Sequence, residues 1–204
     1  MHKKLMLACM AIASMAAFVA SGASASPLLT NSGVAVPVGT SITGKNTGNI
    51  VFTGAFNVTC PSLDLNGTVT ENNGVRIKGE IPVGAFSITG TGAGGDCTSA
   101  LGSVKVTVNS KVCLETNKGT DNLVFTGCGG APYTATFEIT GTGPCKYSVA
   151  SVTATYLTNT GATVNVFEQA TKKEEGGIFC PTEGKADDDL DLYATGGTPQ
   201  LTIS

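Results

Sequence analysis

One pattern of residues occurs twice in this chain, and it constrains the fold more than any other feature. Phe137–Tyr156 reads FEITGTGPCKYSVASVTATY, and Phe86–Val108 reads FSITGTGAGGDCTSALGSVKVTV. In both copies an alternating polar and apolar run ends in Ile-Thr-Gly-Thr-Gly, and a cysteine and a second alternating run follow. Alternation with a period of two predicts a half-buried β-strand. Each copy therefore predicts two strands joined by a glycine-rich connection.

Alternation of this kind continues along most of the chain. Leu65–Glu71 and Val75–Gly79 alternate on either side of Asn73-Gly74, a dipeptide that favours a tight hairpin because both turn residues need a positive φ. The mixed-charge run Gln169–Gly177 (QATKKEEGG) predicts an exposed loop. No run after the first 25 residues has the apolar spacing of an amphipathic helix.

These patterns predict an all-β protein. About a dozen short strands separated by turn residues are typical of an antiparallel β-sandwich of Ig-like or Greek-key type. We expect a single domain over residues 26–204. Because the strand pattern and the cysteine spacing both repeat, two similar half-units over residues 50–110 and 111–204 are the alternative.

The first 25 residues have the features of a secretory signal peptide. Lys3 and Lys4 precede an apolar segment, and Ala23-Ser24-Ala25 fits the small-residue cleavage pattern, so we expect cleavage after Ala25. An uncleaved membrane anchor is the alternative. No later apolar run approaches the roughly 18 residues of a membrane helix. The sequence therefore predicts a secreted or cell-surface protein, with the periplasm as a further option.

Six cysteines follow the leader: Cys60, Cys97, Cys113, Cys128, Cys145 and Cys180. An even number in an exported chain predicts three disulfides. The sequence cannot choose among the many pairings, and we predict that consecutive cysteines pair, as 60–97, 113–128 and 145–180. A thiolate metal site is disfavoured because the chain has no Cys-x-x-Cys and its one histidine, His2, lies in the leader.

Charge and residue types exclude several classes of protein. Without its two lysines in the leader, the chain has 12 − 2 = 10 basic and 15 acidic residues, a net charge of −5. Nucleic-acid binding depends on basic surfaces, so we expect no nucleic-acid partner. Without histidine in the mature chain, neither a Ser-His-Asp triad nor a Cys-His pair can form. We predict no catalytic residues, and a histidine-free hydrolase with paired carboxylates is a distant alternative.

One acidic run suggests a cation site. Asp187, Asp189 and Asp191 have the alternating spacing of the first half of a calcium-binding loop, although Leu192 stands where that loop needs glycine. The alternative is a solvated strand edge that discourages aggregation. Four tyrosines also have two interpretations: they could line a site for a sugar or aromatic ligand by stacking, or they could pack within the strands. These are Tyr133, Tyr147, Tyr156 and Tyr193. No other cofactor is indicated.

The segment FNVTCPSLDLNGTVT around Cys60, the Gly-Thr-Gly connections, Cys145-Lys-Tyr147 and Cys180-Pro181 carry a resemblance. They are similar to small secreted, Thr/Gly-rich, disulfide-bonded bacterial β proteins. More remotely, the chain resembles the exported alkane-oxidation activator family of pseudomonads. The resemblance implies an extracellular accessory role and supplies no functional residues.

Two functions remain open at this point. The first is a non-enzymatic structural, adhesive or accessory role at the cell surface or in the extracellular matrix, with a surface partner or a second copy of the chain. The alternative is a soluble ligand-binding module for carbohydrate or small apolar molecules. A concave pocket with tyrosines and a few polar groups would favour the alternative.

Overall fold

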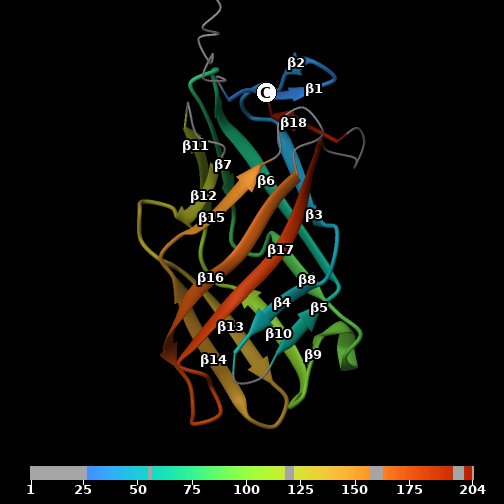
Figure 1. Cartoon of the computed structure of the whole chain (residues 1–204), viewed down its shortest axis with the longest axis vertical. Coiled ribbons are helices and arrows are strands. Elements are labelled where there is room, and N and C mark those ends of the chain that lie inside the picture. The colour runs from blue at the N-terminus through green and yellow to red at the C-terminus, as the bar shows by residue number, and fades with distance from the viewer. Residues whose placement is uncertain (1–26, 55–56, 118–121, 157–162, 195–199, 204) are drawn as a thin grey trace, which may run out of the picture.

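A computed structural model describes residues 27–54, 57–117, 122–156, 163–194 and 200–203 (Figure 1). The predicted signal peptide lies outside these residues. The strands of the first half are β1 Leu29–Asn31, β2 Val34–Ala35, β3 Ser41–Asn46, β4 Ile50–Thr53, β5 Val58–Cys60, β6 Ser62–Asn72, β7 Arg76–Ile81, β8 Phe86–Thr89, β9 Cys97–Ser99 and β10 Gly102–Val108. Those of the second half are β11 Val112–Asn117, β12 Asn122–Gly127, β13 Tyr133–Ile139, β14 Gly143–Val149, β15 Val152–Tyr156, β16 Thr163–Glu175, β17 Glu183–Ala194 and β18 Thr202–Ile203. The helical content of the described residues is one 3₁₀ turn, η1 Ala93–Gly95.

Eight of the described strands close into a barrel. The ladders run in the order β4-β5-β9-β10-β13-β14-β16-β17 and return from β17 to β4. The strands toward the other end, β3, β6, β7, β11, β12 and β15, form a curled half-barrel that starts on β17 and ends on β16. Figure 1 shows β16 and β17 crossing the length of the molecule and serving both parts.

The all-β, antiparallel class is confirmed, and the predicted plain sandwich is wrong. A sandwich keeps two sheets with free edges, whereas here β17 pairs with β3, β4 and β16 at different points along its 12 residues. A strand that pairs on both sides along its length leaves no edge at that position, and a sheet that closes in this way becomes a barrel.

The mixed-charge run that we predicted as a loop contributes to this closure. Its first seven residues, 169–175, belong to β16 and pair with β17 and β14. The charged side chains lie on the solvent face, where Ser148 Oγ donates to Glu174 Oε1 at 2.6 Å and Lys146 contacts Glu175 at 3.0 Å. Polar residues on the outer face of a closed sheet need not interrupt its backbone hydrogen bonds.

All three predicted disulfides are present, in the predicted consecutive pairing: Cys60–Cys97, Cys113–Cys128 and Cys145–Cys180. Cys60 and Cys97 continue the antiparallel register of β5 and β9, with Cα atoms 4.7 Å apart. Three disulfides are consistent with a protein of an oxidising compartment. No helix among the described residues is long and apolar enough to cross a bilayer.

The two copies of the repeated pattern differ in structure. In the second copy, β13 and β14 form a hairpin in which Phe137 pairs with Cys145. In the first copy, β8 pairs with β6, and the chain passes through η1 before Cys97 begins β9. The cysteine follows the glycine-rich connection in both copies, but the strands around it have different partners.

A small sheet covers the half-barrel end. It consists of β18, β1 and β2 (Figure 1). Its side chains Leu29 and Ile203, and the adjoining Leu201, are almost completely buried. The predicted Asn73-Gly74 hairpin lies at the same end, joins β6 to β7 and has Gly74 at φ 75°. The interior below this cap is the hydrophobic core of the molecule.

Candidate functional site

The interior of the barrel contains a cavity of about 150 Å³. Residues of both the closed barrel and the half-barrel line it, so it lies where the two parts meet. Most of the lining consists of aliphatic and aromatic side chains that face inward at alternate strand positions: Ile50, Phe52, Leu63, Leu65, Phe86, Ile88, Val106, Val108, Val112, Phe125, Ala135, Phe137, Val149, Val152, Ala186 and Leu190. The polar residues of the lining are Tyr133, Tyr147, Thr171 and Asp188.

Asp188 is the carboxylic acid of this cavity. On β17 it shares the inward face with the buried Leu190 and Leu192. Its Oδ1 is buried and has no hydrogen-bond partner within the described part of the chain. The pKa of Asp188 is raised to about 7, chiefly because burial desolvates the carboxyl; a hydrogen bond from the Asp189 backbone lowers the pKa and the Asp189 charge raises it. A buried carboxyl without a full set of partners is costly for the fold.

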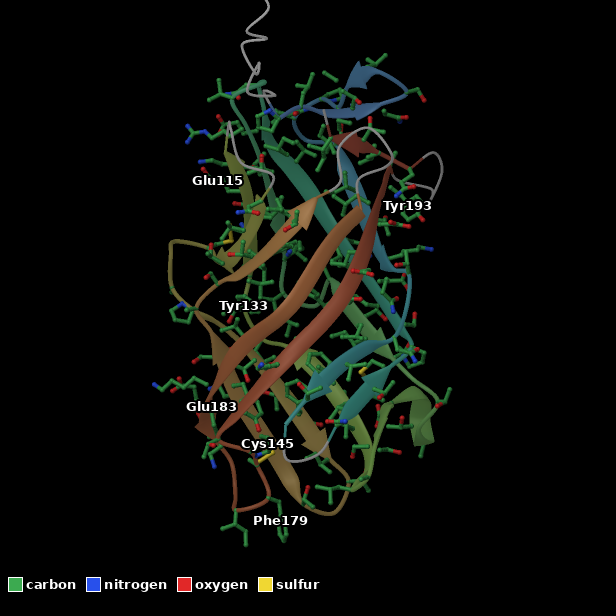
Figure 2. All side chains as sticks on the ribbon, viewed as in Figure 1. Glu115, Tyr133, Cys145, Phe179, Glu183 and Tyr193 are labelled. Atoms are coloured by element: carbon green, nitrogen blue, oxygen red, sulfur yellow. A yellow bond between two sulfur atoms is a disulfide. The ribbon has the colours of Figure 1, made fainter. Side chains whose placement is uncertain are left out.

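The two tyrosines of the cavity supply neutral hydroxyl groups. Burial raises the pKa of both the Tyr133 and the Tyr147 phenols, so each keeps its proton at neutral pH. The Tyr147 hydroxyl donates to the Pro181 carbonyl at 3.0 Å, in the loop between β16 and β17. Tyr133 lies at mid-height of the molecule (Figure 2).

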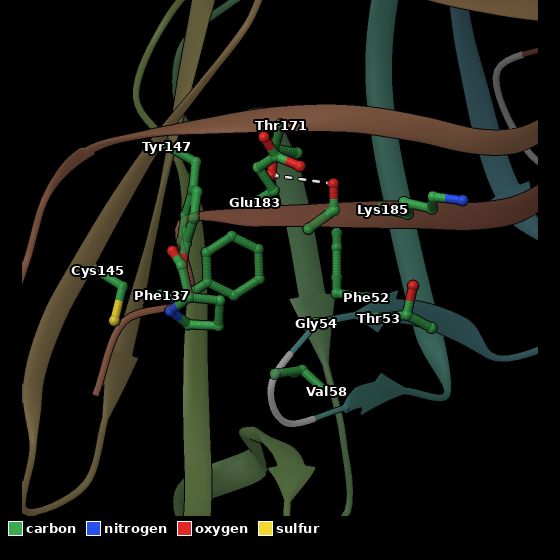
Figure 3. A pocket seen from close by; sticks show the side chains of 12 residues that line it. Phe52, Thr53, Gly54, Val58, Phe137, Cys145, Tyr147, Thr171, Glu183 and Lys185 are labelled. Carbon is green, nitrogen blue, oxygen red and sulfur yellow. Dashed lines mark hydrogen bonds between the residues drawn. The ribbon is translucent and has the colours of Figure 1, made fainter. Parts of the chain in front are cut away.

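An aromatic cluster forms one wall of the cavity. The rings of Phe52 and Phe137 meet edge to face, and Phe137 meets Tyr147 in the same way with centroids 5.6 Å apart. These three side chains and Thr171 also line a neighbouring pocket of about 40 Å³, shown in Figure 3. There Thr171 Oγ1 donates to the Gly184 carbonyl at 3.3 Å, so its hydroxyl is satisfied by the barrel wall.

Tyr193 does not line the cavity. Tyr193 lies on β17 near the cap, where its hydroxyl donates to Asp191 Oδ2 at 3.3 Å (Figure 2). The side chain of Tyr156 lies outside the described part of the structure. Two of the four tyrosines considered from the sequence, Tyr133 and Tyr147, therefore lie in the cavity.

The predicted calcium residues are in an extended strand. Asp187, Asp189 and Asp191 occupy alternate positions of β17, where neighbours on one face are about 6–7 Å apart along the strand. Asp189 is exposed and Asp191 is half-buried. The EF-hand type of site instead wraps a loop around the ion. Calcium binding by these residues stays a prediction.

Within the described ranges, one group of three side chains has its potential metal-ligand atoms within 4.8 Å of one another: Glu80, Cys113 and Cys128. Cys113 and Cys128 form a disulfide, and a disulfide sulfur is not the thiolate that binds metal. Glu80 forms an ion pair with Lys111. This group is therefore a structural feature of the β11–β12 region.

The exposed end of the closed barrel presents two apolar side chains. Ile178 is 93% exposed and Phe179 is 58% exposed, in the loop between β16 and β17 (Figure 2). The Cys145–Cys180 disulfide ties this loop to β14, and Lys173 Nζ donates to the Cys180 carbonyl at 3.2 Å. A short apolar tip is thus held by covalent and polar contacts.

Comparison with known proteins gives no assignment. No protein-family model, no curated protein and no solved structure matches this chain.

Reasoning from the sequence missed Asp188 as a site residue. We considered its neighbours Asp187, Asp189 and Asp191, because their spacing suggested a cation site. The parity of the strand contained the missing information, since residue 188 shares its face with Leu190 and Leu192. An acidic residue on the apolar face of an alternating strand is the signal that could have found it.

Proposed function

We propose that this protein is a non-enzymatic binding protein that holds a small, largely apolar molecule inside its barrel. The observation that carries the proposal is the cavity of about 150 Å³ with an apolar lining and one incompletely bonded carboxyl. A well-packed interior rarely leaves a void of this size, and an apolar cavity of similar volume in another protein takes up benzene.

The setting of the cavity is suited to retention of a ligand. Small closed barrels hold side chains or one small ligand in their interior. Aliphatic and aromatic walls bind by burial of apolar surface, and one or two polar groups fix the orientation of the molecule. The leader and the three disulfides support a role outside the cytoplasm, so the ligand would be taken up from an extracellular or periplasmic medium.

A titration with toluene tests this function. The mature, disulfide-bonded protein is titrated with toluene, and binding is followed by NMR shifts of the methyl groups of Val106, Val149 and Leu190. We expect saturable shifts confined to cavity residues. No shift up to the solubility limit of toluene would overturn the proposal.

A cavity-filling variant gives a matched control. Ala135 lies in the lining, so Ala135→Leu places extra carbon atoms in the cavity and should abolish toluene binding. Ala100 is exposed in the turn between β9 and β10, and Ala100→Leu should leave binding unchanged. Equal binding by the two variants would place toluene elsewhere on the protein.

A surface-contact role is the second candidate, and the apolar tip favours it. Ile178 and Phe179 expose apolar surface where a monomer gains nothing from it, and exposed apolar groups mark contact sites when they cluster. Adsorption to an oil–water interface, measured by pendant-drop tension, should weaken in the double variant Ile178→Ser/Phe179→Ser. Unchanged adsorption would contradict this role.

A further inference from the structure

We propose that the ligand of the barrel cavity is a small apolar amine whose ammonium group contacts Oδ1 of Asp188. The inference rests on the proposed function and adds the chemical class of the ligand. It follows from three features of the site: the position of the carboxyl, the charge of the lining and the size of the cavity.

The position of Asp188 directs a polar group of the ligand to one point. Asp188 is one of the lining residues, and its Oδ1 is buried and has no hydrogen-bond partner among the described residues. A hydrocarbon ligand would leave this oxygen unpaired, whereas an N–H donor would satisfy it. Because the fold already bears the cost of desolvating the carboxyl, a bound donor recovers part of that cost.

The lining contains no compensating positive charge. No lysine, arginine or histidine is among the lining residues in the described part of the chain. The other titratable groups of the lining are the phenols of Tyr133 and Tyr147, which are neutral. A cationic ligand therefore supplies the charge that the site lacks, and a carboxylate ligand would meet repulsion from Asp188.

The size of the cavity limits the apolar part of the ligand to about one ring. The volume is about 150 Å³, and an apolar cavity of about this volume accommodates benzene. The aromatic cluster of Phe52, Phe137 and Tyr147 closes one wall and offers ring edges and faces to an aromatic or cyclic body. An amine on a single-ring or short branched hydrocarbon fits both the volume and the carboxyl.

A ligand series tests the class. Toluene, benzyl alcohol, benzylamine and benzoate have one ring and differ in the polar group, and each is titrated into the mature protein at pH 8 by calorimetry and by NMR. We expect benzylamine to bind at least about 10-fold more tightly than toluene, and benzoate to bind more weakly than toluene.

Two variants locate the preference. Asp188→Asn should reduce the benzylamine preference to about 3-fold or less while toluene binding persists, since the charge is lost and the shape is kept. Asp64 lies on β6 between the lining residues Leu63 and Leu65, faces solvent and pairs with Lys45 at 3.7 Å. Asp64→Asn therefore removes a charge of the same type outside the cavity and should keep the full preference.

The outcomes separate the two proposals. Binding of toluene without a preference for benzylamine overturns the amine assignment and supports a purely apolar site. A preference that survives in Asp188→Asn also overturns it. Binding of none of the four compounds overturns the proposed function and the amine assignment together. The wild-type series decides the class even if Asp188→Asn fails to fold.

Discussion

The rings of Phe52 and Phe137 meet edge to face with centroids 4.9 Å apart, and both line the barrel cavity and the smaller pocket. Phe52 comes from β4 and Phe137 from β13, two strands of the closed barrel that are not neighbours in the sheet. The contact therefore crosses the interior of the barrel. This contact contributes to the packing of the closed barrel and limits the size of the barrel cavity.

Phe137→Ala should destabilise the protein and enlarge its ligand range. Loss of a buried phenylalanine ring costs about 3–5 kcal/mol of the free energy of unfolding, and the vacated space joins the cavity to the smaller pocket. We expect the variant to bind naphthalene, which the wild type should exclude. Urea denaturation and an NMR titration measure the two effects. Phe179→Ala, at the exposed tip, should change stability by no more than about 0.5 kcal/mol.

Asp188 should make stability depend on pH. Its pKa is about 7 in the folded protein, and in the unfolded chain it has the ordinary value of 3.8. The folded state therefore holds the proton more tightly, so this residue lowers stability progressively as the pH rises from about 4 to about 7. The full pKa difference between 3.8 and about 7 corresponds to about 4 kcal/mol, and because Asp188 is only partly buried we expect roughly 2 kcal/mol.

Asp188→Asn isolates this contribution. The difference in free energy of unfolding between the variant and the wild type should rise by roughly 2 kcal/mol from pH 4 to pH 8, in favour of the variant. Asp64→Asn, which alters a surface ion pair, should show no comparable trend. An equal pH dependence in wild type and Asp188→Asn would mean that the carboxyl is solvated.

The three disulfides should contribute unequally. Cys60–Cys97 closes a loop with a sequence separation of 37, and Cys113–Cys128 one of 15. In the chain-entropy account, replacement of both cysteines by serine should cost about 0.8 kcal/mol more for the first pair than for the second. Thermal denaturation of the two double-serine variants measures this order, and a reversed order would show that local packing outweighs loop length.

Asn72 should be the residue that holds the cap on the half-barrel. Its Nδ2 donates to the carbonyls of Leu29 and Val36, at 2.8 and 2.9 Å, and its Oδ1 accepts from the Leu29 N–H at 2.9 Å. Asn72→Ala removes these three hydrogen bonds, although the Leu29 carbonyl still accepts from the Val36 N–H, and should cost about 2–3 kcal/mol.

Asn66 provides the control for Asn72. It lies on the same strand, is exposed, and accepts a hydrogen bond from Thr43. Asn66→Ala should cost about 0.5 kcal/mol or less because water replaces the lost contact. Hydrogen exchange of the Leu29 and Val36 amides would show whether the cap opens in Asn72→Ala.

Local features of this fold could be predicted from the sequence, because they depend on residues close together in the chain. The hairpin at Asn73-Gly74 was predicted correctly, although Gly74 has the positive φ that we expected of both residues and Asn73 does not. Asn73 Oδ1 accepts from the N–H groups of Val75 and Arg76, which adds a local reason for the turn. The consecutive disulfides match the predicted pairing, although the sequence could not exclude the other pairings and two of the bridges close loops with sequence separations of 37 and 35.

The closure of the barrel could not be predicted, since it depends on long strands that pair with different partners at their two ends. Thr163–Glu175 and Glu183–Ala194 carry charged outer faces and therefore lacked the composition of core strands. The cavity is a property of the whole interior, and no local pattern indicates its volume. Unlike the volume of the cavity, the inward position of Asp188 could have been predicted, because the strand alternation places it on the same face as Leu190 and Leu192.

A crystal structure of the mature protein grown with benzylamine tests the central claim most directly. We expect density for one ring between Phe137 and Leu190, with the nitrogen within hydrogen-bond distance of Asp188 Oδ1. A cavity that holds only ordered water at saturating benzylamine, or an interior that has closed so that no cavity is present, would contradict it.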